Sequence, residues 1–188
     1  MKPMALYLHI PFCRRKCSYC DFCSFPGHEE DFLPYLDALK REFRQSWNPE
    51  WEIASLYIGG GTPTVLSPSA LVDLVQTLKS AAPIRLGAEV TIEANPGTVR
   101  AEGLAQLLAA GVNRLSIGAQ SGQDRLLQVL GRIHTAAEVE ATVAAKDLPT
   151  LVWISFMVCP GSPWPTGSRP SRGQRRSSPI TFPVMGCK

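Results

Sequence analysis

Four of the six cysteines in this 188-residue chain lie within eleven residues, at Cys13, Cys17, Cys20 and Cys23. The first three have the spacing Cys-x3-Cys-x2-Cys, in a loop that directly follows a predicted strand over Leu6–Ile10. Structural zinc and a disulfide pair are the ordinary alternatives for clustered cysteines. Zinc normally takes four ligands in two well-separated pairs, and a reducing cytosol disfavours disulfides. Three thiolates in one loop instead favour an iron–sulfur cluster with one iron left without a protein ligand.

A second motif, Gly59-Gly60-Gly61, directly follows a predicted strand over Ile53–Ile58, and Thr62 adds a hydroxyl beside it. On its own, a run of three glycines is most simply a flexible turn. Next to the cysteine loop it indicates a binding turn, because the carboxyl ends of strands in α/β sheets are where ligands bind. Glycine also lets the backbone approach a ligand closely.

Elements that could position these motifs alternate along the chain up to about residue 146. Ser67-Pro68 is a typical helix start, Gly111 is a typical helix end, and Thr135 with Glu138 forms a capping box. Alternating strands and helices with short connections favour an α/β fold, a parallel sheet with helical crossovers. Because four or five units are too few for a closed eight-stranded barrel, we predict a partial β/α barrel truncated after about five units. The predicted strands are Leu6–Ile10, Ile53–Ile58, Glu89–Ala94 and Arg114–Ile117. The predicted helices are Glu30–Ser46, a helix that begins at Pro68, a helix from Thr98 to Gly111, Ser121–Leu130 and a helix that begins at Thr135.

Six co-ordered stretches resemble motifs of the radical S-adenosylmethionine (SAM) superfamily. The resemblance is closest to the branch that holds anaerobic coproporphyrinogen III oxidases and HemW-type heme chaperones. It covers the chain from Leu6 to about Lys146, which we interpret as an incomplete radical SAM core of residues 1–146. The matching stretches are Leu6 to Cys13 (LYLHIPFC), Lys16 to Phe22 (KCSYCDF), Tyr57 to Thr64 (YIGGGTPT), Glu93 to Gly97 (EANPG), Asn113 to Ser121 (NRLSIGAQS) and Leu130 to Arg132 (LGR).

The resemblance implies two cofactors, a [4Fe-4S] cluster and S-adenosylmethionine, with heme as the expected cargo. One electron from the cluster cleaves the sulfonium of S-adenosylmethionine, and this chemistry belongs to the cofactor. The implied cluster ligands are Cys13, Cys17 and Cys20. The residues implied to surround S-adenosylmethionine are Tyr19 beside the adenine, Tyr7 near the methionine end, Gly60, Gly61 and Thr62 at the amino group, Glu93 and Gln120 at the ribose, and Arg132 as a partner for a substrate carboxylate.

Four further residues are expected to lie outside this chemistry. The oxidase-type members carry a fourth cysteine two positions after the third, whereas Cys23 is three positions after Cys20, so we interpret Cys23 as a non-ligand. His9 belongs to the first strand motif, and we expect it to be packed near the site rather than bound to metal. We expect His28 and His134 to be surface residues.

Two functions of different classes fit the resemblance. One is a heme chaperone that keeps the cluster and the S-adenosylmethionine site but transfers heme to an acceptor protein. The other is a radical enzyme that oxidatively decarboxylates coproporphyrinogen III in porphyrin biosynthesis, and a further radical oxidoreductase of the same branch is a third alternative. The oxidase branch has a substantial extension before the first strand, where this chain has five residues, and it has the closer fourth cysteine. Both differences favour the chaperone, with heme or a porphyrinogen as partner and the electron donor unidentified.

Composition and charge argue against other classes. The chain is 45% hydrophobic, with mean hydropathy near zero. No apolar run reaches the roughly 18 residues that a membrane span needs, and no basic-then-apolar leader precedes the first strand. We therefore expect a cytoplasmic protein without an integral membrane segment. Residues 1–147 hold 14 basic and 16 acidic side chains, a balance that gives no electrostatic reason to expect nucleic acid as a partner.

The composition changes after residue 147. From Leu148 onward there are five basic residues and no acidic ones, and six of the 16 prolines occur from Pro160 onward. A natural, disordered basic tail is one explanation. The other explanation is a shift of the reading frame.

Genetic-code degeneracy favours the frame shift. In the family, the fourth helix is followed by a strand that ends in Asp and then by a Tyr-Gly-Leu-Pro-Gly turn. When the third base of each codon is read with the first two of the next, Trp153 and Ile154 require Asp, and Met157 and Val158 require Gly. The neighbouring codons permit the rest of the turn. We predict that the frame slips near Asp147, that residues 147–188 are a disordered out-of-frame tail, and that the family's last strands and C-terminal domain are missing.

Overall fold

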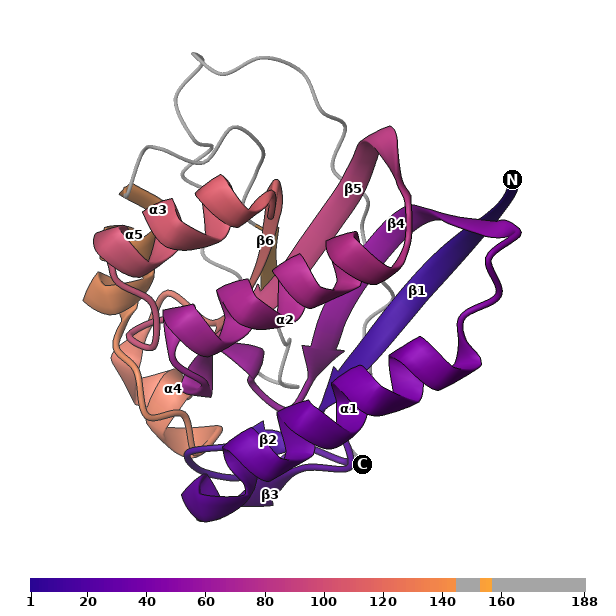
Figure 1. The fold of residues 1–188 in the computed structure, drawn as a ribbon. Helices are drawn as coiled ribbons and strands as arrows, with labels where there is room; N and C mark the ends of the chain where they lie inside the picture. Colours follow the sequence, from indigo (N-terminus) through magenta and orange to yellow (C-terminus); the bar gives the residue numbers. More distant parts are fainter. Residues whose placement is uncertain (145–152, 157–188) are drawn as a thin grey trace.

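The computed structural model describes residues 1–144 and 153–156 of the chain. It contains one large sheet, one small sheet and the helices that connect their strands (Figure 1). The strands are β1 (Lys2–Ile10), β2 (Phe12–Cys13), β3 (Phe25–Pro26), β4 (Trp51–Gly60), β5 (Ile84–Ala94), β6 (Arg114–Gln120) and β7 (Trp153–Phe156). The helices are α1 (Phe32–Ser46), α2 (Pro68–Ala81), α3 (Ala101–Ala110), α4 (Asp124–Val129) and α5 (Ala136–Ala144), with 3-10 turns η1 (Glu29–Asp31) and η2 (Pro63–Val65).

The large sheet has the strand order β1-β4-β5-β6-β7, and all neighbouring strands are parallel. Each strand of this sheet therefore pairs with the next one along the chain, as successive strands do in a β/α barrel. The register aligns Ile58 with Ile92 and Ile92 with Leu115, so one apolar row crosses three strands. The predicted α/β fold, a partial barrel with a parallel sheet, is confirmed.

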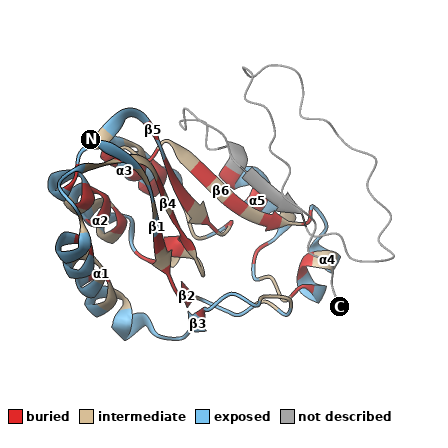
Figure 2. Ribbon diagram, turned by 90° about the vertical axis from the view of Figure 1, so that its right-hand side faces the viewer, coloured by how far each residue is buried: buried red, intermediate tan, exposed pale blue. Residues whose placement is uncertain are grey.

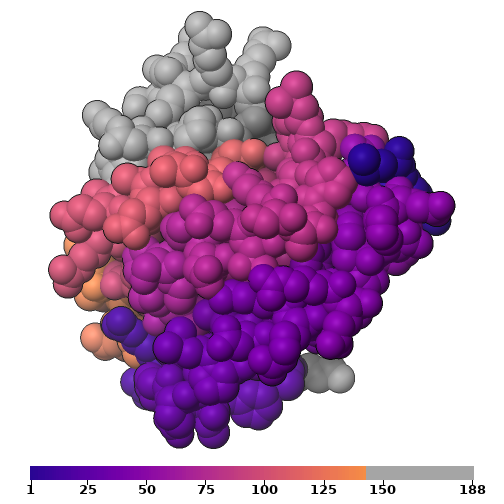
Figure 3. Space-filling view, viewed as in Figure 1, coloured from indigo at the N-terminus to yellow at the C-terminus, as the bar shows by residue number. Residues whose placement is uncertain are grey.

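The hydrophobic core lies between the sheet and the helices α1, α2 and α3, which cover one face of it (Figure 1). In Figure 2 the buried residues follow the sheet and the sides of the helices that meet it. The space-filling view in Figure 3 shows the same helices from outside, covering this face. The apolar stripe of α2 points into this core, since all four of its members are at most 1% exposed: Leu71, Leu74, Val75 and Leu78.

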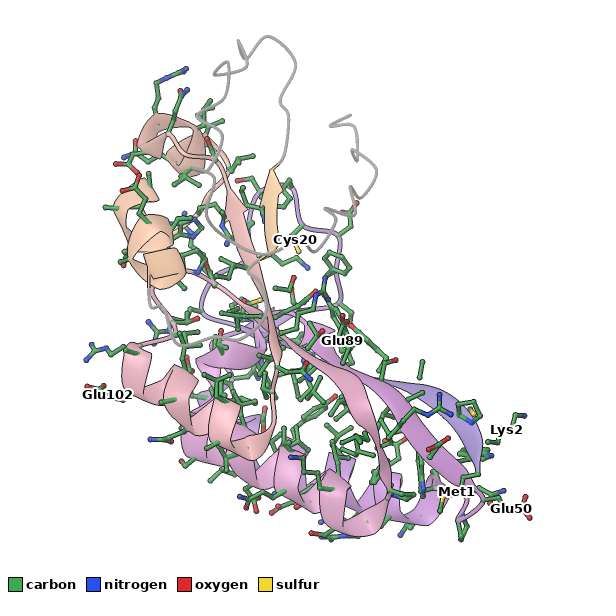
Figure 4. All side chains as sticks on the ribbon, turned by 90° about the horizontal axis from the view of Figure 1, so that it is seen from above. Met1, Lys2, Cys20, Glu50, Glu89 and Glu102 are labelled. Atoms are coloured by element: carbon green, nitrogen blue, oxygen red, sulfur yellow. The ribbon has the colours of Figure 1, made fainter. Side chains whose placement is uncertain are left out.

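The opposite face of the sheet is polar. Successive side chains of a strand point to opposite faces, so the residues between the core positions point away from the helices. Figure 4 shows Glu89 of β5 on that side of the sheet, and Cys20 lies on the same side. The side chains that alternate with the core positions are Tyr7 and His9 of β1, Tyr57 of β4, Glu89 and Glu93 of β5, and Arg114, Ser116 and Gln120 of β6.

Local signals fix several helix ends as the sequence predicts. The Ser67 hydroxyl accepts a hydrogen bond from Ala70 N at 3.2 Å and caps α2. Gly111 ends α3 with a φ of +99°, a left-handed conformation that glycine adopts without strain. The third helix begins at Ala101 rather than at the predicted Thr98, because the Thr98 hydroxyl donates to Asn95 O within the preceding turn.

None of the helices in the described part of the chain is long and apolar enough to span a membrane. The predicted boundary after residue 146 lies outside the described residues. The predicted tail does too, except for β7, which pairs in parallel with β6 and forms the fifth strand of the sheet.

Candidate functional site

The cysteine loop leaves the carboxyl end of β1 and is closed by the small sheet. Strand β2, which contains Cys13, pairs with β3, and Phe25 N donates a hydrogen bond to Pro11 O at 2.7 Å. Between these strands Cys20 N donates to Cys17 O at 3.2 Å, which forms a tight turn. The side chains of Cys13, Cys17 and Cys20 are half-buried, while Cys23 is exposed, and all four are free thiols.

The glycine turn after β4 lies directly against the beginning of the cysteine loop. Gly61 N donates to Ile10 O at 2.8 Å, and Thr62 N donates to Phe12 O at 2.7 Å. The Thr62 hydroxyl lies 3.6 Å from Cys13 Sγ. A Cβ atom on Gly61 would lie 2.5 Å from Phe12 O and 2.9 Å from Cys13 Sγ. Only glycine fits there, so the two motifs that the sequence singled out form one surface.

The three thiols are not gathered as closely as ligands around a single metal ion. Within the described residues, one group of three His, Cys, Asp or Glu side chains has its potential ligand atoms within 4.8 Å of one another. This group is His28, Glu30 and Asp31, and all three residues are exposed. The sulfurs of Cys13, Cys17 and Cys20 do not all lie within 4.8 Å of one another. Sulfur ligands on one tetrahedral zinc lie about 3.8 Å apart, given a Zn–S bond of about 2.3 Å. A cluster, in which each thiolate binds a different iron, accommodates wider spacing.

Glu93, at the carboxyl end of β5, has two hydrogen-bond donors. The Tyr57 hydroxyl donates to Oε1 at 2.5 Å, and Gly60 N donates to Oε2 at 3.1 Å. Burial and the Glu93 charge together raise the pKa of Tyr57 above its ordinary value, which keeps the phenol protonated as a donor. Tyr7 stacks on Tyr57 with ring centroids 5.9 Å apart. Sequence reasoning missed Tyr57 as a partner of Glu93, although its position in the glycine motif could have suggested it.

Arg132 reaches the cysteine loop from the segment after α4. Its Nη1 donates to Cys17 Sγ at 3.3 Å, and its Nη2 donates to Asn95 Oδ1 at 2.8 Å and to Gly118 O at 2.5 Å. The buried Nε atom of Arg132 has no hydrogen-bond partner among the residues that the structure describes. A buried donor without a partner is uncommon, and it marks a position where a ligand acceptor would be stabilised.

His134 corrects one prediction. It was expected at the surface, but it is 4% exposed, and its Nδ1 and Nε2 lie 2.8 Å from Asn95 Oδ1 and 3.1 Å from Ala119 O. Burial is the main cause that lowers its pKa, and the Arg132 charge acts in the same direction. The sequence could not reveal this position, because the contacts come from Asn95, directly after β5, and from Ala119 of β6. Asn95, which joins Arg132 to His134, was likewise not singled out.

The other two histidines lie as expected. The side chain of His28 is 48% exposed, so its predicted surface position is confirmed. His9 is half-buried, with Nδ1 3.2 Å from the Tyr7 hydroxyl and Nε2 3.1 Å from Cys23 O. It therefore connects β1 to the end of the cysteine loop.

A pocket joins several of the predicted site residues at the carboxyl ends of β4, β5 and β6. Its lining is Gly61, Thr62, Glu93, Ala94, Asn95, Ser116, Ile117, Gly118 and Arg132. Gln120, which lies outside this lining, has a φ of +63°, and no other non-glycine residue in the described ranges has a positive φ. Such strain is typical of functional positions. Tyr7 and Tyr19 also lie outside the pocket lining, and burial raises the pKa of Tyr19 above its ordinary value.

Comparison with known proteins agrees with the fold and the motifs. The sequence profile of the Radical SAM superfamily matches residues 7–164, which extends past the predicted boundary at residue 146. The chain is 40% identical over 151 residues to Heme chaperone HemW of Haemophilus influenzae, a match that covers 76% of this chain and 39% of the relative. It is also 40% identical over 151 residues to Heme chaperone HemW of Escherichia coli, covering 78% and 39%. The chain thus spans about two fifths of the length of these curated relatives.

A solved structure shows the same arrangement. Coproporphyrinogen III oxidase (HemN) from Escherichia coli, described as a radical SAM enzyme, superposes with a TM-score of 0.70. The sequence identity is 29%, and the match covers 77% of this chain and 34% of the oxidase.

Proposed function

The chain belongs to the radical SAM superfamily, and from that membership we propose that it holds a [4Fe-4S] cluster on the cysteine loop and S-adenosylmethionine beside it, at the pocket that Gly61, Glu93 and Arg132 help to line at the strand ends. Cys13, Cys17 and Cys20 are the proposed cluster ligands, and one iron stays open for the amino and carboxylate groups of S-adenosylmethionine. When bound, the cluster supplies the electron for cleavage of the sulfonium.

Three features of the chain support this proposal. The donor set is three half-buried free thiols in one loop, which suits a cluster better than a mononuclear site. The turn at Gly60 and Gly61 packs closely against the start of the cysteine loop, since a Cβ atom on Gly60 would lie 2.8 Å from the His9 ring and Ile10 O. The buried Nε of Arg132 offers a donor without a protein acceptor in the described residues. The observation that carries the proposal is the contact of Gly61 with Cys13, which brings the two motifs together.

The remaining contacts to S-adenosylmethionine are assigned in the same proposal. Glu93 accepts hydrogen bonds from the ribose hydroxyls with the oxygen lone pairs that Tyr57 and Gly60 leave available. The others are Tyr19 beside the adenine, Tyr7 near the methionine end, Thr62 at the amino group, Gln120 at the ribose and Arg132 at a substrate carboxylate.

Anaerobic reconstitution with iron and sulfide tests this part directly. The electron paramagnetic resonance spectrum of the reduced cluster is recorded before and after addition of S-adenosylmethionine. A change in the spectrum is expected, because the ligand binds the open iron. An unchanged spectrum, at a concentration that saturates related sites, contradicts an open iron in this chain.

Of the two functions considered, we propose the heme chaperone first, with heme as its cargo. Both curated relatives reported above are named heme chaperones and are 40% identical, whereas the oxidase is 29% identical. The proposed role is transfer of heme to an acceptor protein, and oxygen-independent oxidation of coproporphyrinogen III is the alternative. Heme titration followed by visible absorbance, with transfer to an apo-globin as readout, supports the chaperone. Consumption of coproporphyrinogen III without heme transfer supports the oxidase instead. Because the cytosol keeps thiols reduced and so available as cluster ligands, the proposal puts the protein in the cytoplasm.

The proposal treats this chain as a fragment of a longer heme chaperone-like protein, with a radical SAM core of residues 1–146 and an out-of-frame stretch over residues 147–188. Support comes from the code, since Trp153 with Ile154 and Met157 with Val158 require the family's Asp and Gly in the shifted frame. Sequencing the gene across the codons for Lys146 to Gly161 tests it. An extra or missing base is expected. An intact frame would remove this part of the proposal and leave the match to residue 164 as ordinary similarity.

A further inference from the structure

The segment that follows α4 is bound to the cysteine loop at three successive residues. Leu130 O accepts a hydrogen bond from Ser18 N at 3.2 Å. Gly131 has a φ of +70°, and a Cβ atom there would lie 2.8 Å from Ser18 Oγ. Arg132 Nη1 donates to Cys17 Sγ at 3.3 Å. The second cysteine of the loop is therefore held by a segment more than a hundred residues away along the chain.

The guanidinium of Arg132 is fixed in this position from its other side. Its Nη2 donates to Asn95 Oδ1 and to Gly118 O, and Asn95 is in turn held by the buried His134 at 2.8 Å. A side chain with one anchor directly after β5 and another on β6 has lost most of its freedom before any cofactor binds. The Arg132 side chain is thus held in the conformation that contacts Cys17, whereas an exposed arginine would adopt many conformations.

We infer that Arg132 tunes the reduction potential of the cluster through its hydrogen bond to Cys17, a role beyond that of a carboxylate partner. This inference rests on the proposed cluster. Reduction adds one electron to the cluster, forms or breaks no bond to Arg132 and transfers no proton. A permanently charged guanidinium that donates to the thiolate stabilises the reduced state, which carries the extra negative charge, more than the oxidised state. Arg132 therefore raises the potential.

Neutral variants of the 188-residue chain test the inference. Arg132→Met and Arg132→Gln are reconstituted anaerobically beside the wild-type chain, and iron per chain is measured for each. Dithionite then supplies electrons in a mediated redox titration followed by electron paramagnetic resonance, without S-adenosylmethionine. At a fixed ambient potential, we expect a ratio of reduced to oxidised cluster about tenfold lower, equal to a midpoint about 59 mV more negative for one electron. Arg132→Lys keeps the charge and should recover part of the shift.

Arg85→Met is the matched control, because Arg85 forms a half-exposed ion pair with Glu52 at 2.6 Å and does not contact the cysteine loop. Its midpoint should equal that of the wild type. An unchanged midpoint in either neutral Arg132 variant with a full iron content overturns the inference while leaving the cluster proposal intact. If the wild-type chain itself takes up no cluster, the proposed function fails and the inference with it. A merely structural role of Arg132 predicts reduced iron content without a change of midpoint, which also overturns the inference.

Discussion

Replacement of Gly61 by alanine should separate the cysteine loop from the glycine turn. The added Cβ would lie 2.5 Å from Phe12 O, 3.0 Å from Phe12 C and 2.9 Å from Cys13 Sγ. Two of these atoms belong to the backbone, so no change of rotamer relieves the contact, and the loop must move by about 1 Å to reach ordinary van der Waals distance. Overpacking of this kind costs about 1–3 kcal/mol.

The same movement weakens two hydrogen bonds that join the motifs, Gly61 N to Ile10 O and Thr62 N to Phe12 O. Each contributes about 0.5–1.5 kcal/mol. Gly61→Ala should therefore lower the free energy of unfolding by about 2–4 kcal/mol, and iron uptake on reconstitution should fall with it because Cys13 is displaced. Urea unfolding of the apo chain and iron per chain after reconstitution are the two assays.

Gly122→Ala is the control, since its φ is not positive and a Cβ there would meet nothing within 4 Å. It should change the free energy of unfolding by less than about 0.5 kcal/mol and leave iron uptake at the wild-type level. If Gly61→Ala behaves like Gly122→Ala in both assays, the close contact between the glycine turn and the cysteine loop is wrong.

Three further predictions concern residues around the site. Tyr57→Phe removes the hydrogen bond to Glu93 and should cost about 1.5–3 kcal/mol in urea unfolding, because the acceptor is charged. Since the pKa of Tyr57 is raised in the folded state, the wild-type chain should also lose stability as the pH rises above 10, and the Tyr57→Phe chain should lose less stability over the same range. His134 has a lowered pKa, so the wild-type chain should lose stability as the pH falls below 6.5, where unfolded His134 binds a proton that the folded state resists. His134→Gln should flatten that dependence in unfolding experiments at pH 7.5 and 5.5, and an equally steep loss in both chains contradicts the assignment. Thr135→Ala removes the side-chain half of the capping box, in which the Thr135 hydroxyl accepts a hydrogen bond from Glu138 N at 3.2 Å, and should cost about 0.5–2 kcal/mol by the same measurement, with no effect expected on iron uptake.

Local chemistry explains what the sequence could predict. Proline at the first helical position after Ser67, glycine at the end of α3 and the capping box at Thr135 act over a few residues, so their effects are readable without the fold. The same holds for the cysteine and glycine motifs, because each follows its strand directly. A parallel sheet is enough to predict that the cysteine and glycine motifs lie side by side, since the carboxyl ends of neighbouring parallel strands share one edge.

Contacts between distant segments explain what the sequence missed. The residues beside His134 give no sign that it is buried, because its partners, Asn95 directly after β5 and Ala119 of β6, are distant in the sequence. The bond from Tyr57 to Glu93 depends on the register of β4 against β5, which pairs Tyr57 with Thr91 and brings its side chain beside Glu93. The contact of Arg132 with Cys17 depends on how the segment after α4 packs. None of these has a signal within a few residues.

The most direct test of the account compares Cys20→Ala with Cys23→Ala after anaerobic reconstitution, by iron and acid-labile sulfide per chain. The account assigns Cys20 to the cluster and leaves Cys23, which is exposed, outside it. The wild type and Cys23→Ala should each hold about four iron and four sulfide, as one [4Fe-4S] cluster requires, and Cys20→Ala should hold far less. Equal loss in both variants, or a wild-type chain that retains one zinc and no sulfide, would contradict the central claim.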